Sequence, residues 1–169
     1  MQKRKVSWDE FQGLVAKLCR DITLSEWKPD YIVGITRGGL LPAVMISQYF
    51  GVPCEALKVS LRDNGGEHAT ESNCWMSEDA FNGKNILIVD DINDTGATIN
   101  WIIDDWPQSC MPQDERWEND VWNVNVRFAT VFDNLSSDVY LKIDYTGEEI
   151  NKAENDVWID FPFEEWWTK

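Results

Sequence analysis

The sequence has few basic residues: 15 Lys and Arg stand against 30 Asp and Glu, and the net charge is −15. Binding to nucleic-acid phosphates relies on Lys and Arg, so this balance argues against a nucleic-acid-binding protein and against an anionic membrane surface. The chain also lacks any apolar run long enough to span a membrane, and its first residues, MQKRKVSWDE, lack the apolar core of a signal peptide. We therefore expect a cytoplasmic protein that contacts neither membrane nor nucleic acid.

Cysteine and histidine are scarce as well. The four cysteines form no CxxC pair and lack the density of a secreted disulfide scaffold, so we expect reduced, mostly structural thiols; there is a single histidine. By contrast, the chain is rich in tryptophan, with ten Trp among 169 residues. That length and an ordinary apolar content predict a single globular domain over residues 1–169.

Two short apolar runs predict buried strands, because strands covered on both faces lack alternation. They are YIVGI (31–35) and ILIV (86–89), and each is followed by a turn and a predicted helix. Further strands are expected at 55–61, 124–132 and 139–145. A capping pattern at Ser7 predicts a first helix of about four turns. Alternating strands and helices indicate an α/β fold, an open, mostly parallel sheet flanked by helices.

Two segments lack a clear period. Residues 62–83 are polar and contain Gly65-Gly66, which predicts a long loop, and loops of this length are typically functional lids or disordered segments. Residues 105–123 are acidic and rich in Trp, and we expect Trp106, Trp117 and Trp122 to pack in the core or at an oligomer contact.

The strongest chemical signal is ILIVDDINDTGAT, residues 86–98. Asp90 and Asp91 end a buried strand, where burial and mutual repulsion are costly unless hydroxyls or a cation balance them. The glycine turn that follows leads into a helix, whose free N–H groups can bind an anion. This combination indicates a ligand with a phosphate at one end and hydroxyls or a metal at the other.

The acids and the D-T-G-x-T turn resemble the signature for 5-phosphoribosyl 1-diphosphate (PRPP) in type I phosphoribosyltransferases. ITRGGLLPA (35–43) resembles their pyrophosphate loop, and both ends of the chain, VSWDEFQGLVAKL and DVWIDFPFEEWW, resemble bacterial xanthine-guanine phosphoribosyltransferases. The resemblance implies a small C-terminal hood that binds the base, and a homo-oligomer.

The resemblance also implies a role for each matching residue. Asp94 is the acid/base group beside the purine, and Asp91 and Asp160 lie at the Mg²⁺ site. The base is expected to contact Trp158 by stacking and Ile159 through its carbonyl. The PRPP-binding residues it implies are Arg37, Gly38, Asp90, Asp91, Asp94, Thr95, Gly96, Ala97 and Thr98.

One position departs from the family pattern. Where the bacterial enzymes have a lysine that contacts the oxygen on C6 of the base, this chain has Asn134. An amide can donate to an oxo group or accept from an amino group, so adenine or a modified base stays open beside guanine, xanthine and hypoxanthine. In the lid, Arg62 is a candidate for pyrophosphate, and His68 is expected to be an exposed loop residue.

The expected activity is Mg²⁺-dependent transfer of phosphoribose from PRPP to a purine base in purine salvage. Two alternatives are a PRPP-binding regulator without turnover and an aspartate-nucleophile phosphatase. The negative charge argues against a nucleic-acid-binding regulator, and Asp94 argues against lost catalysis. The phosphatase would need an acid-x-acid motif after the first strand, which YIVGITRGG lacks.

Overall fold

The computed structural model describes residues 1–59, 61 and 74–169, and its centre is a sheet of five parallel strands. From one edge to the other they are β3 (Cys54–Leu57), β2 (Tyr31–Ile35), β4 (Ile86–Asn93), β5 (Val126–Asn134) and β6 (Tyr145–Ile150). The predicted parallel α/β sheet is confirmed. Because β2 leads outward to β3 and the chain then returns to β4 on the other side, the strand order reverses between β2 and β4.

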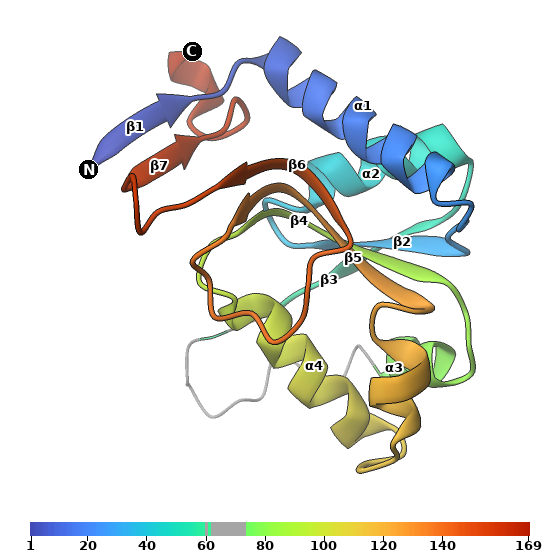
Figure 1. The fold of residues 1–169 in the computed structure, drawn as a ribbon. Helices are drawn as coiled ribbons and strands as arrows, with labels where there is room; N and C mark the ends of the chain where they lie inside the picture. The colour runs from blue at the N-terminus through green and yellow to red at the C-terminus, as the bar shows by residue number, and fades with distance from the viewer. Residues whose placement is uncertain (60, 62–73) are drawn as a thin grey trace.

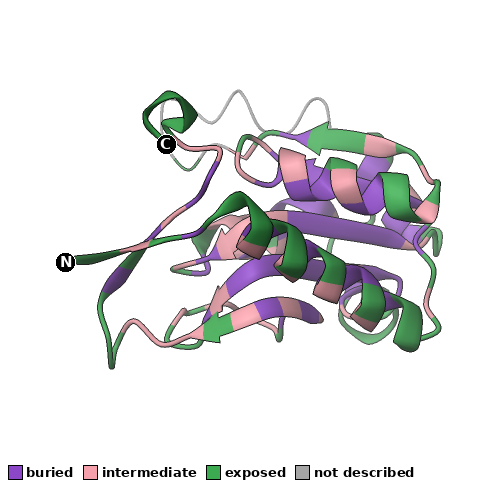
Figure 2. Ribbon diagram, turned by 90° about the horizontal axis from the view of Figure 1, so that it is seen from above, coloured by how far each residue is buried: buried purple, intermediate pink, exposed green. Residues whose placement is uncertain are grey.

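Helices cover both faces of the sheet (Figure 1). One face carries α1 (Trp8–Leu24) and α2 (Leu40–Phe50), and the other carries α3 (Cys74–Phe81) and α4 (Ala97–Ser109). Each face has its own apolar cluster, so the central strands are buried on both sides (Figure 2). In the part of the chain described, no helix combines the length and apolarity needed to cross a membrane.

Local signals set the ends of the first helices. Ser7 caps α1 and its hydroxyl accepts from the Glu10 amide at 3.0 Å, as the capping pattern predicts. Gly51 ends α2 with a left-handed φ of 66°, a conformation that glycine adopts without steric cost.

A second, smaller unit lies beside the carboxyl ends of the main strands. β1 (Gln2–Lys5) pairs in parallel with β7 (Val157–Asp160), and the chain ends in a 3₁₀ helix at Trp166–Thr168. Phe161 stacks on Phe163 and anchors this unit against the sheet through the main core cluster. Both termini lie at this end of the molecule (Figure 1).

The prediction of a strand at 139–145 is wrong. The last strand is β6, Tyr145–Ile150, whose sequence YTGEEI contains a glycine and two glutamates. Gly147 is needed there because a Cβ would lie 2.4 Å from the Val131 carbonyl oxygen. The apolar alternation of 139–143 instead serves a loop that packs Val139, Leu141 and Ile143 on the α3–α4 side.

Other boundaries also differ from the prediction. The predicted loop 62–83 contains the helix α3, because Met76, Ala80 and Phe81 bury an apolar face. Pro107 does not stop α4, which continues to Ser109, since proline removes only one donor in the last turn. β3 is shorter than predicted. The lid prediction for residues 62–73, with Arg62 and His68, lies outside the described residues.

The segment 105–123 contains the end of α4 and a π-helical turn, Trp117–Val121. Trp106, Trp117 and Trp122 are buried, and the Trp122 ring contacts the other two in tilted pairs, with ring centres 6.0 Å from Trp106 and 5.5 Å from Trp117. The prediction that these tryptophans serve packing is therefore confirmed.

Candidate active site

A cavity of about 760 Å³ opens at the carboxyl ends of β2 and β4. This is where the strand order reverses, the usual ligand position in an open α/β sheet. The lining residues come from four parts of the chain, namely Arg37 and Gly38; Asp91, Ile92 and Asp94; Lys152; and Trp158, Ile159, Phe161, Phe163, Glu164, Glu165, Trp166 and Trp167.

Asp91 lines the cavity, and Asp90, which is not among the lining residues, precedes it on β4. Asp90 Oδ1 accepts from the Asp91 amide at 2.9 Å, and Asp91 Oδ1 accepts from the Ile92 amide at 2.7 Å. Burial raises the pKa of both carboxyls, and the charge of Asp91 raises the pKa of Asp90 further. Such a pair is balanced best by hydroxyl donors or a cation, as the sequence analysis anticipates.

The turn after β2 reaches the same carboxylates. Arg37 and Gly38 line the cavity, and the Thr36–Arg37 peptide is cis. A Cβ at Gly38 would lie 2.0 Å from Asp91 Oδ2, so only glycine permits this approach of the two turns. The predicted pyrophosphate loop and acidic turn are thus in contact.

The turn after β4 leads into α4. Gly96 caps that helix with a φ of 92° and no side-chain cap, while Thr95 Oγ1 accepts from the Ala97 amide at 3.2 Å. Gly96 also packs so closely on the 135–144 loop that a Cβ would lie 2.5 Å from the Val139 nitrogen. A 13-residue helix that begins without a side-chain cap offers its N–H groups to a phosphate, the role expected for Thr95 to Thr98.

The opposite wall comes from β7 and the loop before it. Trp158 is 45% exposed and presents its ring to the cavity, whereas Ile159 is buried. Lys152 places Nζ 5.7 Å from the centre of the Trp158 ring and 2.9 Å from Asp94 Oδ1. The Lys152 ammonium therefore lies over the Trp158 ring and contacts the Asp94 carboxylate directly.

Asn134, expected to contact the base, is placed differently. Its side chain is buried and bonded within the protein, to the carbonyl of Asp94 and to the amide of Lys152. Lys152, which was not predicted from the sequence, lines the cavity. It follows β6, the neighbour of β5 in the sheet, so only a correct placement of β6 would have pointed to it.

Asp160, expected at a metal, forms an ion pair with Lys169 at 2.7 Å. Glu164 lies nearby; burial raises its pKa, and the charges of Asp91 and Asp160 add to that effect. Over the described ranges, no three acidic, His or Cys side chains form a metal site by themselves. The donors suit Mg²⁺, which binds through one or two carboxylates together with waters and substrate phosphates.

The cavity thus joins Arg37, the Asp91 carboxylate and an aromatic face beside the Asp94–Lys152 pair. Thr95 to Thr98, at the start of α4, follow Asp94 directly in the chain but are not among the lining residues. The family model described as "phosphoribosyl transferase domain" matches residues 7–164. The chain belongs to the phosphoribosyl transferase domain family. The type I phosphoribosyltransferase fold expected from the sequence is confirmed.

Relatives of this phosphoribosyl transferase domain include xanthine phosphoribosyltransferase 1 of Saccharomyces cerevisiae, which is 26% identical. That match covers 60% of this chain and 59% of the yeast protein, so the chain spans about three fifths of that relative.

Two solved structures share the fold over nearly their whole length. Purine phosphoribosyltransferase from Pyrococcus horikoshii has a TM-score of 0.65 at 24% identity, covering 96% of this chain and 94% of its own. Xanthine-guanine-hypoxanthine phosphoribosyltransferase from Helicobacter pylori has a TM-score of 0.65 at 16% identity, covering 99% and 97%.

Proposed function

We propose that the protein transfers the 5-phosphoribosyl group from PRPP to a 6-oxopurine in a Mg²⁺-dependent reaction. The products are a purine nucleoside monophosphate and pyrophosphate, which makes this a salvage reaction. The observation that carries the proposal is the meeting of Asp94, Lys152 and Trp158 beside the phosphate turn in one cavity. The names of the relatives, which are purine or xanthine phosphoribosyltransferases, agree with it.

The phosphate end of PRPP fits the start of α4. Thr95, Thr98 and the uncapped amides of α4 bind the 5-phosphate, and Asp90 and Asp91 accept from the ribose hydroxyls. Arg37 and the backbone at Gly38 face the leaving pyrophosphate. Asp91 and Asp160 are the carboxylates that would hold Mg²⁺, which stabilises charge on the pyrophosphate when bound.

The reaction exchanges two bonds at the anomeric carbon. The bond to pyrophosphate breaks with its electron pair on the leaving oxygen, and a ring nitrogen of the base bonds to the carbon. The carbon is positive in the transition state, which the carboxylates of Asp90 and Asp91 favour. Asp94 takes the proton that the purine loses. No covalent enzyme intermediate is required.

Lys152 supports a base with an oxygen on C6. Its ammonium carries only donors, so it pairs with an oxo group and repels the amino group of adenine. Adenine stayed a candidate base because the Asn134 amide could accept a hydrogen bond from its amino group. That amide is instead hydrogen-bonded within the protein. We therefore propose that Lys152 contacts the oxygen on C6 of the base, that Trp158 stacks on the base, and that the Ile159 carbonyl hydrogen-bonds to its edge. Homo-oligomer formation and a cytoplasmic location stay predictions from the sequence.

The test is to incubate the purified protein with PRPP, MgCl₂ and one base at a time, and to quantify nucleotide and pyrophosphate. Guanine, xanthine, hypoxanthine, adenine and uracil form the panel. We expect nucleotide with one or more oxopurines, and stoichiometric pyrophosphate. Asp94→Asn should lower kcat at least about 100-fold while PRPP affinity changes little.

Other outcomes point elsewhere. Release of inorganic phosphate in place of pyrophosphate would identify a phosphatase. PRPP binding without nucleotide from any base would identify a regulator of the same fold. Product from adenine alone would overturn the role of Lys152.

A further inference from the structure

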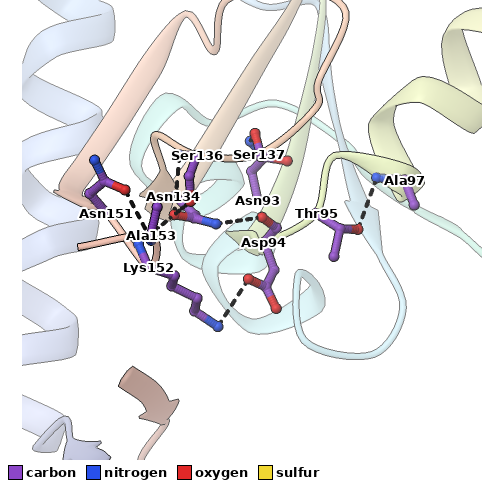
Figure 3. A network of polar contacts seen from close by, with 10 residues as sticks. All are labelled: Asn93, Asp94, Thr95, Ala97, Asn134, Ser136, Ser137, Asn151, Lys152 and Ala153. Atoms are coloured by element: carbon purple, nitrogen blue, oxygen red, sulfur yellow. Dashed lines mark hydrogen bonds and ion pairs between the residues drawn. The ribbon is translucent and has the colours of Figure 1, made fainter. Parts of the chain in front are cut away.

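The buried side chain of Asn134 connects three segments that surround the proposed base site. Its Nδ2 donates to the Asp94 carbonyl at 2.8 Å, and its Oδ1 accepts from the Lys152 amide and the Ser136 hydroxyl, each at 2.9 Å (Figure 3). Only 5% of the residue is exposed. A buried amide with both ends satisfied has one orientation, so its partners are fixed relative to each other.

The segments that carry Asp94 and Lys152 are also in contact through the side chains of these two residues. Lys152 Nζ and Asp94 Oδ1 are 2.9 Å apart, so the two residues are joined once through their backbones and once through their charges (Figure 3). Asp94 follows β4, whereas Lys152 follows β6. Asn134, at the end of β5 between those strands, is therefore the connection that sets the distance between the two loops.

We propose that Asn134 is a positioning residue, which holds Asp94 and Lys152 as one pre-oriented pair for proton transfer and base recognition. The inference rests on the proposed function. Asn suits the position because it donates at one end and accepts at the other. An ionised Asp keeps the acceptor arm and loses the donor arm to Asp94, so Asn134→Asp breaks one half of the connection.

The chain offers a matched control on the phosphate side. Asn100 Nδ2 donates to the Asp138 carbonyl and its Oδ1 accepts from the Tyr140 amide, at 2.9 and 2.8 Å. The Asp138 amide in turn donates to the Thr95 carbonyl at 2.9 Å. Asn100→Asp is thus the same chemical change in a brace that supports the phosphate turn and not Lys152.

The experiment compares kcat/KM for the base and KM for PRPP in parent, Asn134→Asp and Asn100→Asp. Asn134→Asp should lower kcat/KM for the best oxopurine about 10- to 100-fold, because small displacements of catalytic groups are costly. Its KM for PRPP should stay within about threefold of parent, since the phosphate turn keeps its own brace. Asn100→Asp should show the reverse pattern. Thermal unfolding verifies that each variant folds.

A double-mutant cycle with Lys152→Met tests whether Asn134 acts through Lys152. The inference requires that Asn134→Asp costs several-fold less in the Lys152→Met background than in parent, because the pair is already broken. An equal cost in both backgrounds, or parent-like kinetics of Asn134→Asp, would overturn it while leaving the proposed function intact. If Asn134→Asp does not fold, Asn134→Ser is measured in the same cycle. A parent that forms no nucleotide from any base would instead overturn the proposed function, and this inference with it.

Discussion

Lys152 and Asp94 lie on opposite loops of the cavity, and their side chains form an ion pair of 2.9 Å. The Lys152 side chain is only 15% exposed, whereas that of Asp94 is 40% exposed, so the contact is sheltered from water on the lysine side alone. Its Nζ also lies over the Trp158 ring, 5.7 Å from the ring centre. The ammonium therefore contacts the Asp94 carboxylate and lies over the Trp158 ring, the two groups to which we assign proton transfer and base stacking in the proposed function.

Lys152→Met should shift base selection. A hydrogen bond to a charged group contributes about 1.5–3 kcal/mol, so kcat/KM for an oxopurine should fall roughly 10- to 100-fold. The value for adenine should fall less or rise. Steady-state kinetics on guanine, xanthine, hypoxanthine and adenine measure the ratio, and Lys152→Arg serves as the charge-conserving control. Equal losses with every base would show that Lys152 supports Asp94 only.

Trp158→Ala should weaken base binding and leave PRPP binding alone. Stacking of an aromatic side chain on a base contributes on the order of 1–3 kcal/mol, which predicts a rise in KM for the base of about 5- to 100-fold. Trp158→Phe should recover part of the loss. Trp8→Ala is the control, because Trp8 is similarly exposed at 52% and lies outside the cavity lining. An unchanged KM for the base in Trp158→Ala would remove the stacking role.

Gly38→Ala should abolish most activity through crowding. The added Cβ would lie 2.0 Å from Asp91 Oδ2, so either the loop or the carboxylate must move. We expect kcat/KM for PRPP to fall at least about 100-fold. Gly13→Ala is the matched control, because nothing lies within 4 Å of its Cβ on α1. That variant should keep full activity and unfold at a higher temperature, with a gain of about 0.5–1 kcal/mol. Parent-like kinetics in Gly38→Ala would show that the close contact has no functional role.

The parts of the site that sequence alone predicts are those encoded within a few residues. The apolar runs form β2 and β4 as expected, and Gly38 and Asp91 line the cavity, but β4 continues through Asp90 and Asp91 to Asn93, past the predicted strand end at residue 89. Parallel strands bring their carboxyl ends to one edge, so local motifs on two strands specify one cavity.

The base side was not predictable in the same way, because it depends on the position of β6. The alternating residues 139–143 gave a stronger strand signal than YTGEEI, although the latter forms β6. That choice moved the predicted strand end away from Ile150 and hid Lys152. Asn134 was assigned to the base from its position after VRFATVF, and its contact with the base stays a prediction. Its amide is hydrogen-bonded to the Asp94 carbonyl and the Lys152 amide, tertiary contacts that a residue-by-residue resemblance does not contain.

Asp105 should make stability depend on pH. This carboxyl of α4 is 9% exposed, and its Oδ2 has no hydrogen-bond partner among the described residues. Burial raises its pKa from 3.8 to about 6. The folded state thus holds the proton more tightly than the unfolded state, so the free energy of unfolding falls as pH rises from about 4 to about 6.

Asp105→Asn removes this titration. At about pH 7.5 the variant should be more stable than parent by about 1–2 kcal/mol, since it no longer buries an unpaired charge. Below about pH 3 the two proteins should unfold alike, because Asp105 is then protonated in both states. Urea unfolding from about pH 3 to 7.5 measures the difference. Asp104→Asn is the control. It removes the same charge from the neighbouring residue, whose side chain is exposed. A stability difference that is constant with pH, or the same in both variants, would mean that the charge of Asp105 is not what destabilises the fold.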